Sequence, residues 1–190
     1  MKQEANTMTL GKQTKETGRP VILLTMTGLF AAMITIMTAY ICHIPSGING
    51  GYIHFGDALI YLCAALLPQP YALAAAAIGG GMADLLTAPM WVPATLIIKT
   101  LLTLPFTNKG EKILCRRNVI AVFAAFAITG FGYFCAERIL FGTVSALIAS
   151  VTGNIIQSGG SAVFFFAIAA AFDRAHIKVK FNETLRRGQA

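Results

Sequence analysis

Charged residues are scarce in this chain of 190 residues. Asp, Glu, Lys and Arg together make up 12% of the sequence, whereas hydrophobic residues make up 56% and the mean hydropathy is +0.67. An ordinary soluble domain carries about twice that share of charged residues. The composition therefore excludes an ordinary soluble domain and indicates a protein of the lipid bilayer.

Residues that build catalytic and metal centres are also few. The sequence holds three histidines and contains no HExxH, GxSxG or P-loop motif. Its four cysteines are scattered without CxxC spacing, which favours small packing residues over metal or redox chemistry. We therefore expect no metal site, no cofactor, no enzymatic activity and no ATP hydrolysis by this chain itself.

Long uncharged runs fill most of the chain. Val21–Ile41 and Asn118–Ala136 contain 21 and 19 residues without a charge, and about 20 helical residues cross the hydrocarbon core of a bilayer. The first twenty residues are polar, and no small-residue cleavage pattern follows the first apolar run. We interpret this start as a cytoplasmic tail and an uncleaved first helix, not a signal peptide.

Prolines interrupt the middle of the chain, in PQP at 68–70 and APMWVP at 88–93. Proline and the residue before it disfavour continuous helix. These breaks predict an all-α membrane fold with six transmembrane helices, at Val21–Ile41, Asp57–Leu67, Tyr71–Leu86, Pro93–Phe106, Asn118–Ala136 and Thr143–Phe172. The alternative is five spans, with one helix over Ala58–Ala83 that is kinked at the prolines.

Basic residues distinguish the two models, because Lys and Arg near the ends of spans favour the cytoplasmic side. Six spans with both termini cytoplasmic place 13 basic residues inside and only Arg138 outside, whereas five spans would place nine of them outside. We expect a polar cytoplasmic tail over 1–20, a six-helix membrane domain over 21–172 and a basic cytoplasmic tail over 173–190. The net charge of +7 then reflects orientation in the bilayer, aided by anionic lipid, and not nucleic-acid binding.

The second and third predicted spans are short, at eleven and sixteen residues. Short helices are tolerated in a membrane only where protein or a water-filled cavity surrounds them, so we expect a cavity. The connection before them, from Cys42 to Asp57, is rich in glycine and carries Asn49, Tyr52 and His54. It is longer than a turn requires, and we interpret it as a lid over a bound molecule in preference to a solvated turn.

Charged and aromatic residues near the spans are the candidates for binding. Asp57 stands at the start of the second span, where we prefer helix capping to ligand contact. Asp84 and Lys99 fall at similar depth in neighbouring spans, so they either pair with each other or line the cavity and bind ligand groups. Trp91 lies in an outer connection, where it either anchors in the membrane interface or stacks on a flat ligand.

Polar and small residues mark two further helix faces. Asn154 and Gln157 share one face of the last span, with Ser158 and Ser161 close to it, and they either join helices or bind a ligand. Small residues recur every four positions on the first span, which allows another helix to approach closely. That helix belongs to this protein or to a partner, and the candidates for partner docking are Gly28, Ala31, Ala32 and Thr35.

Three stretches together resemble a known family. They are GYIHFGDALIYLCAALLPQPYALAAAAIGGGMADLL over 51–86, LIIKTLL in the fourth span and GNIIQSGG in the last span. Their order and spacing, with six predicted spans, are similar to an S component, the substrate-binding subunit of an energy-coupling-factor (ECF) transporter. The resemblance is to riboflavin-type and queuosine-precursor-type members and covers residues 21 to about 172.

The resemblance implies a multi-pass protein of the bacterial plasma membrane that captures a vitamin or vitamin-like precursor from outside. It would act with a transmembrane coupling protein and two ATPase subunits, as part of an ABC-type importer. In that family the pocket lies in the outer half of the bundle beneath the loop after the first span. Here that pocket corresponds to Asn49 through Asp57, Trp91, Lys99 and Asn154, and the small-residue ridge on the first span would meet the coupling protein.

The resemblance favours a flat nitrogen heterocycle as the substrate, first a queuosine precursor or related base and then riboflavin. The alternative function is a membrane scaffold of the cell-shape type, which would bind no metabolite. An intramembrane enzyme is disfavoured because no nucleophile and base can be paired by motif.

Overall fold

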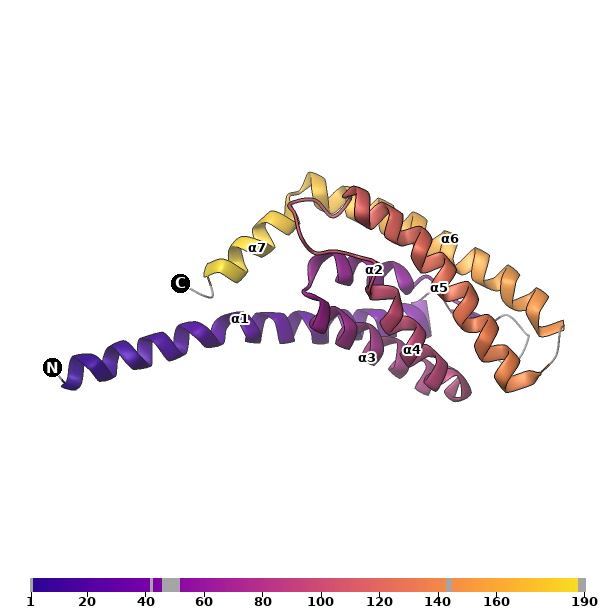
Figure 1. The fold of residues 1–190 in the computed structure, drawn as a ribbon, viewed down its shortest axis with the longest axis horizontal. Helices are drawn as coiled ribbons and strands as arrows, with labels where there is room; N and C mark the ends of the chain where they lie inside the picture. Colours follow the sequence, from indigo (N-terminus) through magenta and orange to yellow (C-terminus); the bar gives the residue numbers. More distant parts are fainter. Residues whose placement is uncertain (1, 42, 46–51, 143–144, 188–190) are drawn as a thin grey trace.

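The computed structural model describes residues 2–41, 43–45, 52–142 and 145–187. Seven α-helices and one short hairpin-like pair of strands, β1 with β2, make up these parts of the chain (Figure 1). The elements are α1 (Lys2–Ile36), which continues as a π-helical turn (Met37–Ile41), β1 (Ile44–Pro45), β2 (Tyr52–Ile53), α2 (Asp57–Leu66), α3 (Gln69–Thr87), a 3₁₀ turn (Pro89–Trp91), α4 (Val92–Thr103), α5 (Arg116–Phe141), α6 (Ser145–Arg174) and α7 (Ile177–Arg187).

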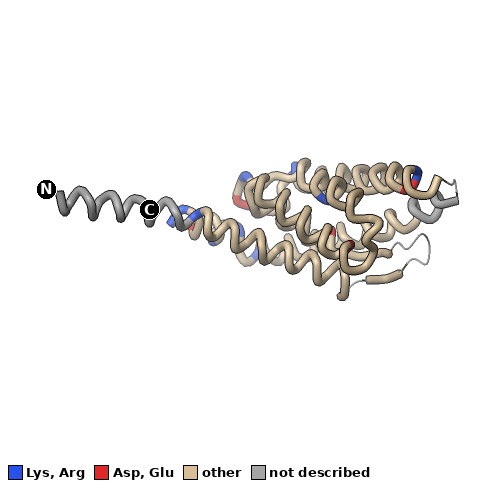
Figure 2. The backbone as a smooth tube through the Cα atoms, turned by 90° about the horizontal axis from the view of Figure 1, so that it is seen from below, with Lys and Arg blue, Asp and Glu red and all other residues tan. Residues whose placement is uncertain are grey.

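The helices form a bundle around the short helix α2. Helices α1, α3 and α4 pack together on one side, and α5 and α6 lie side by side on the other (Figure 1). Helix α7 turns back from the end of α6 toward α1, so that the long α1 and α7 extend from the same end of the bundle. Blue Lys and Arg positions gather toward this end in Figure 2, while most of the bundle carries none.

The prediction of a helical fold is confirmed within the described residues, and each of the six predicted spans overlaps a helix there. Three helices are long and apolar enough to cross a membrane, at Arg19–Ile41, Arg116–Phe141 and Thr152–Arg174. Helix α2 spans only ten residues and α4 only twelve, so the count of six crossings and the side of the termini stay predictions. Thr143, the predicted start of the last span, lies outside the described residues.

The alternative of one kinked helix over Ala58–Ala83 is wrong. The backbone at Leu67 is extended, with φ −90° and ψ 152°, and a new helix begins just after Pro68. Both segments predicted as polar tails are largely helical, because α1 already begins at Lys2 and α7 follows α6 after a turn at His176.

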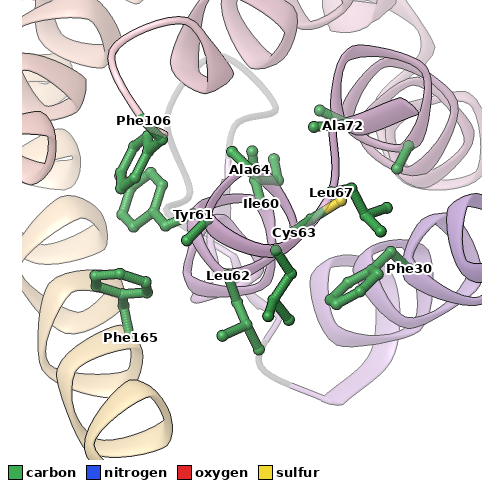
Figure 3. Close-up of a cluster of buried hydrophobic side chains, with 14 of the residues drawn as sticks. Phe30, Ile60, Tyr61, Leu62, Cys63, Ala64, Leu67, Ala72, Phe106 and Phe165 are labelled. Carbon is green, nitrogen blue, oxygen red and sulfur yellow. The ribbon is translucent and has the colours of Figure 1, made fainter. Parts of the chain in front are cut away.

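Protein encloses α2 almost completely, as the short length of this span predicted. Every residue of α2 except Leu59 is buried. The ring of Tyr61 stacks on Phe106 with a centroid distance of 5.1 Å and meets the edge of Phe165 at 5.9 Å (Figure 3). On another side of α2, Cys63 and Leu67 face Phe30 and Ala72 (Figure 3). A ten-residue helix thus avoids lipid and serves as the centre of the bundle.

Helices α1 and α3 approach closely at Gly79. The hydroxyl of Thr35 donates a hydrogen bond to the carbonyl oxygen of Gly79 at 3.0 Å. A Cβ placed on Gly79 would lie 2.8 Å from both the carbonyl oxygen of Ala31 and the Cβ of Ile34. The small-residue ridge of α1 therefore divides: Ala31 and Thr35 pack against α3, whereas Gly28 and Ala32 are exposed.

Two side chains, one at the end of α6 and one at the start of α5, hold the connection between α4 and α5 in place. The carboxylate of Asp173 accepts hydrogen bonds from the backbone N–H groups of Ile113 at 2.7 Å and Leu114 at 2.9 Å. The fully buried amide of Asn118 bonds to the backbone N–H and carbonyl of Thr107. These bonds satisfy backbone groups that the loop leaves outside any helix.

Substitution of Gly79 by Ala should destabilise the protein by about 1–3 kcal/mol, because the added methyl group overlaps backbone and a β-branched side chain that have no room to move. Gly28→Ala is the matched control, since nothing lies within 4 Å of a Cβ there and alanine is the better helix former. Thermal unfolding in detergent measures both. Equal stability of the two variants would contradict the close α1–α3 contact.

Candidate functional site

A buried ion pair joins α2 to α4. The ammonium group of Lys99 lies 2.7 Å from a carboxylate oxygen of Asp57, and the two side chains are 2% and 0% exposed. The second carboxylate oxygen of Asp57 accepts a hydrogen bond from the amide of Gln157 on α6 at 3.2 Å. One carboxylate thus binds groups from two other helices, and this set of three residues fixes the relative positions of α2, α4 and α6.

This arrangement corrects the preferred role of Asp57. The N-cap of α2 is Gly56, and Asp57 is the first helical residue, with its carboxylate bound to Lys99 and Gln157. The capping interpretation is therefore wrong. Asp57 still occupies the first turn, where the helix dipole favours a negative charge.

A second polar group surrounds Asp84 on α3. The hydroxyl groups of Tyr52 and Thr95 each donate a hydrogen bond to one of its carboxylate oxygens. The hydroxyl of Thr95 also lies 3.1 Å from that of Tyr133 on α5. The predicted pairing of Asp84 with Lys99 is wrong, because Lys99 forms its ion pair with Asp57 and, among the described residues, none is found with Asp84.

The described end of the first connection packs onto the bundle. Tyr52 reaches Asp84 from β2, and burial together with that carboxylate raises the pKa of Tyr52, so the hydroxyl stays protonated as a donor. Phe55 stacks on Phe164 of α6 with a centroid distance of 5.5 Å. A Cβ on Gly160 would overlap the ring of Phe55. This segment therefore covers α3 and α6, while its role as a lid stays a prediction.

His54 is buried in the same segment. Its Nδ1 accepts a hydrogen bond from the backbone N–H of Gly56 at 3.1 Å, which places the ring proton on Nε2. Burial, with the positive charge of Lys99, lowers the pKa of His54 to about 3. The imidazole is therefore neutral at physiological pH.

Trp91 is buried, and its predicted anchoring in the membrane interface is wrong. Its indole meets the ring of Tyr133 edge-on and lies against Phe141, both with centroid distances of 5.9 Å. Only 6% of the residue is exposed. The alternative of stacking on a flat ligand stays open, since these aromatic rings lie next to the Asp84 group.

The remaining predicted site residues fall on two segments. Gln157 belongs to the Asp57 group and Asn154, one turn before it on α6, is half-buried. Asn49 lies outside the described residues. The structure thus brings Asp57, Lys99 and Gln157 into one group and joins Tyr52 to Asp84 in another.

Several buried side-chain atoms have no hydrogen-bond partner in the described part of the chain. They include the indole nitrogen of Trp91 and the hydroxyls of Thr129, Ser158 and Ser161. A buried polar atom without a partner costs about 1–3 kcal/mol. These atoms are therefore candidates to bind a ligand.

Two members of the Asp84 group escaped the sequence analysis. Thr95 stands four residues before Lys99, and that spacing places both on one face of α4. Tyr133 stands four residues before the buried Glu137 on α5. Thr95 therefore carries a signal in the sequence, one helical turn from the candidate Lys99, whereas Tyr133 lies near no candidate charge on its own helix.

Loss of Lys99 alone should be severe, because it leaves the carboxylate of Asp57 buried without a counter-charge. We expect Lys99→Met to destabilise the protein by about 3–5 kcal/mol. The double variant Lys99→Met with Asp57→Asn removes both charges and should regain much of that loss. Unfolding in denaturant measures the stability of the wild type and of both variants. A Lys99→Met variant as stable as the wild type would show that the pair has no structural role.

Acid should destabilise the protein through His54. The unfolded chain takes up a proton at this position below about pH 6.5, while the folded protein keeps the imidazole neutral down to about pH 3, so lowering the pH favours unfolding. Between pH 7 and 5 the wild type should lose about 2 kcal/mol more stability than His54→Asn, which retains an acceptor but does not titrate. Identical pH profiles of the two proteins would contradict a buried neutral imidazole.

Comparison with known proteins identifies relatives of this chain. The family model described as "ECF-type riboflavin transporter, S component" matches residues 20–174, and the resemblance inferred from the sequence is thereby confirmed. A protein of Pyrococcus woesei, described as "Uncharacterized protein in gap 3'region", is 30% identical over 119 residues, which cover 63% of this chain and 67% of that protein.

Proposed function

The chain belongs to the family of ECF-type riboflavin transporter S components, and on that premise we propose that it captures a vitamin-like flat nitrogen heterocycle. It is a multi-pass membrane protein and the substrate-capture subunit of a transporter. ATP hydrolysis belongs to the partner subunits of that transporter. Our order of preference for the substrate is a queuosine precursor or related base, then riboflavin. We place the protein in a bacterial plasma membrane.

The observation that carries this proposal is the concentration of buried polar groups at one part of an otherwise apolar bundle. Tyr52, Asp57, Asp84, Lys99 and Gln157 come from β2 and four helices. Buried charges in a membrane protein are costly and mark binding sites or transport paths. The Asp57–Lys99 pair also has a structural role, so the Asp84 group and the unpartnered hydroxyls are the features that favour a binding site over a scaffold.

Hydroxyl groups without partners support a ligand at the same place. Ser158 and Ser161 follow Gln157 on α6, are 3% and 0% exposed, and have no hydrogen-bond partner among the described residues. A heterocycle with N–H and carbonyl groups would form hydrogen bonds with these hydroxyls. It would also exclude water from beneath the segment that contains Phe55. Each satisfied bond would contribute about 1 kcal/mol to binding.

Transport would require partners. The family implies a membrane coupling protein and two ATPase subunits, and we propose that the exposed Gly28 and Ala32 on α1 contribute to the surface that meets the coupling protein. Small residues there would let a partner helix approach closely. Ala31 and Thr35 would support that face from behind through their contacts with α3.

A thermal-shift screen of the purified protein in detergent against riboflavin, thiamin, folate, queuine and related deazapurines tests the proposal. One compound should raise the melting temperature. Ser158→Ala and Asn154→Ala should then weaken its binding at least tenfold, or about 1.4 kcal/mol, as measured by calorimetry.

The serine variant separates binding from folding. Because its hydroxyl has no partner in the protein, Ser158→Ala should leave the melting temperature of the free protein unchanged or raise it. Gly28→Ala is the control. Gly28 lies on α1, outside the polar groups, and this variant should bind the ligand with wild-type affinity. The absence of any shift with a broad panel would argue for a scaffold.

A further inference from the structure

Charges in the buried polar region do not balance. Two carboxylates, Asp57 and Asp84, are 0% and 4% exposed, and Lys99 is 1% exposed. The single ammonium group is bound to Asp57 at 2.7 Å. Asp84 receives only the hydroxyl groups of Tyr52 and Thr95, so within the described residues its negative charge has no cationic partner at ion-pair distance.

Aromatic rings lie next to this carboxylate. Trp91 packs with Tyr52, Tyr133 and Phe141 in one cluster, which we call the aromatic box. Two of its members are tied to the Asp84 group by hydrogen bonds, Tyr52 directly and Tyr133 through Thr95. Ring faces attract positively charged groups, and aromatic boxes are a common means of binding organic cations.

The box also holds an unpartnered donor. The indole nitrogen of Trp91 is buried and has no hydrogen-bond partner in the described part of the chain. Its ring meets Tyr133, whose hydroxyl lies 3.1 Å from Thr95, the residue that binds Asp84. A ligand in the box would therefore meet an acceptor carboxylate, aromatic faces and one free N–H donor.

We propose that the ligand of this protein is an organic cation, whose positively charged nitrogen is bound by Asp84 within the aromatic box of Tyr52, Trp91, Tyr133 and Phe141. This inference rests on the proposed function and narrows its substrate class. The cation supplies the charge that Asp84 lacks, and its flat ring lies against the aromatic side chains.

Lys99 does not provide a site for an anionic ligand. An ammonium group that is already neutralised by Asp57 and lies 5.4 Å from the centroid of the Tyr133 ring is poorly placed to receive an anion. A phosphate or carboxylate brought into this region would add a second unpaired negative charge beside Asp84. The protein therefore selects against phosphorylated forms of the same heterocycle.

Matched pairs of compounds test the charge requirement. One pair is 7-aminomethyl-7-deazaguanine, whose side chain is an ammonium at neutral pH, and the uncharged 7-cyano-7-deazaguanine. A second is thiamin and thiamin monophosphate. Riboflavin and its phosphate, neither of which is a cation, serve as the comparison without a positive charge. In calorimetry with the wild type, a cationic member should bind at least tenfold tighter than its uncharged or phosphorylated counterpart, and Asp84→Asn should abolish that preference.

The unliganded variants test the charge imbalance separately. Asp84→Asn keeps the shape of the side chain and removes the charge. Its carbonyl oxygen accepts from one of the two hydroxyl groups and its NH2 group donates to the other, so its melting temperature should equal or exceed that of the wild type. Asp57→Asn is the matched control and should melt several degrees lower, since it leaves Lys99 without its carboxylate. A marked loss of stability in Asp84→Asn would overturn the inference.

The outcomes distinguish this inference from the proposed function. Tight binding of an uncharged or anionic compound that persists in Asp84→Asn would overturn the cation requirement and leave the capture function standing. Failure of every compound to bind would count against capture of a heterocycle, and the stabilities of the two unliganded variants would then decide whether Asp84 carries an unbalanced charge.

Discussion

The ion pair between Asp57 and Lys99 is the constraint on which the rest of the structure depends. Neither group would be tolerated alone in an apolar bundle, since an isolated buried charge costs several kcal/mol. Their contact at 2.7 Å, together with the amide of Gln157, requires α2, α4 and α6 to meet at one level. Because α2 is a ten-residue helix enclosed by protein, its first residue lies inside the bundle and not at a lipid surface. The pair thus places charged groups at the start of a short helix in the centre of the bundle.

The same pair decides what the neighbouring residues are able to do. Once Lys99 is paired with Asp57, Asp84 has the hydroxyls of Tyr52 and Thr95 as its hydrogen-bond partners among the described residues, and no ion pair of its own. A structure that divides its charges in this way has one satisfied pair and one carboxylate with capacity to receive a partner. The aromatic rings beside Asp84 favour a flat cation as that partner. Selectivity for a cation would then depend on the pairing of Lys99 with Asp57 and not with Asp84.

The segment that precedes α2 covers this part of the bundle. Tyr52 and Phe55 contact α3 and α6, and Gly56 lies so close to Thr38 in the π-helical turn that a side chain there would overlap its hydroxyl. The segment is therefore held to several parts of the bundle by a small number of contacts, and one of them, Tyr52 with Asp84, joins two candidate ligand-binding residues. A ligand that binds Asp84 would compete with Tyr52 for the carboxylate oxygens.

The sequence by itself determined the class of the protein and the approximate limits of its helices. Composition and uncharged runs reveal a membrane protein, and prolines separate α2 from α3, because these signals are local properties of the chain. It also identified Asp57, Asp84, Lys99 and Gln157 as unusual, because a polar residue within an apolar segment is recognised without knowledge of the tertiary structure. Only the tertiary structure decided which of them pair, that Asp57 binds Lys99 instead of capping its helix, that Trp91 is buried, and that Thr95 and Tyr133 join the site. Those choices depend on the rotation and depth of helices distant in sequence, to within an ångström or so, and helical periodicity alone carries no information about which face of one helix meets which face of another.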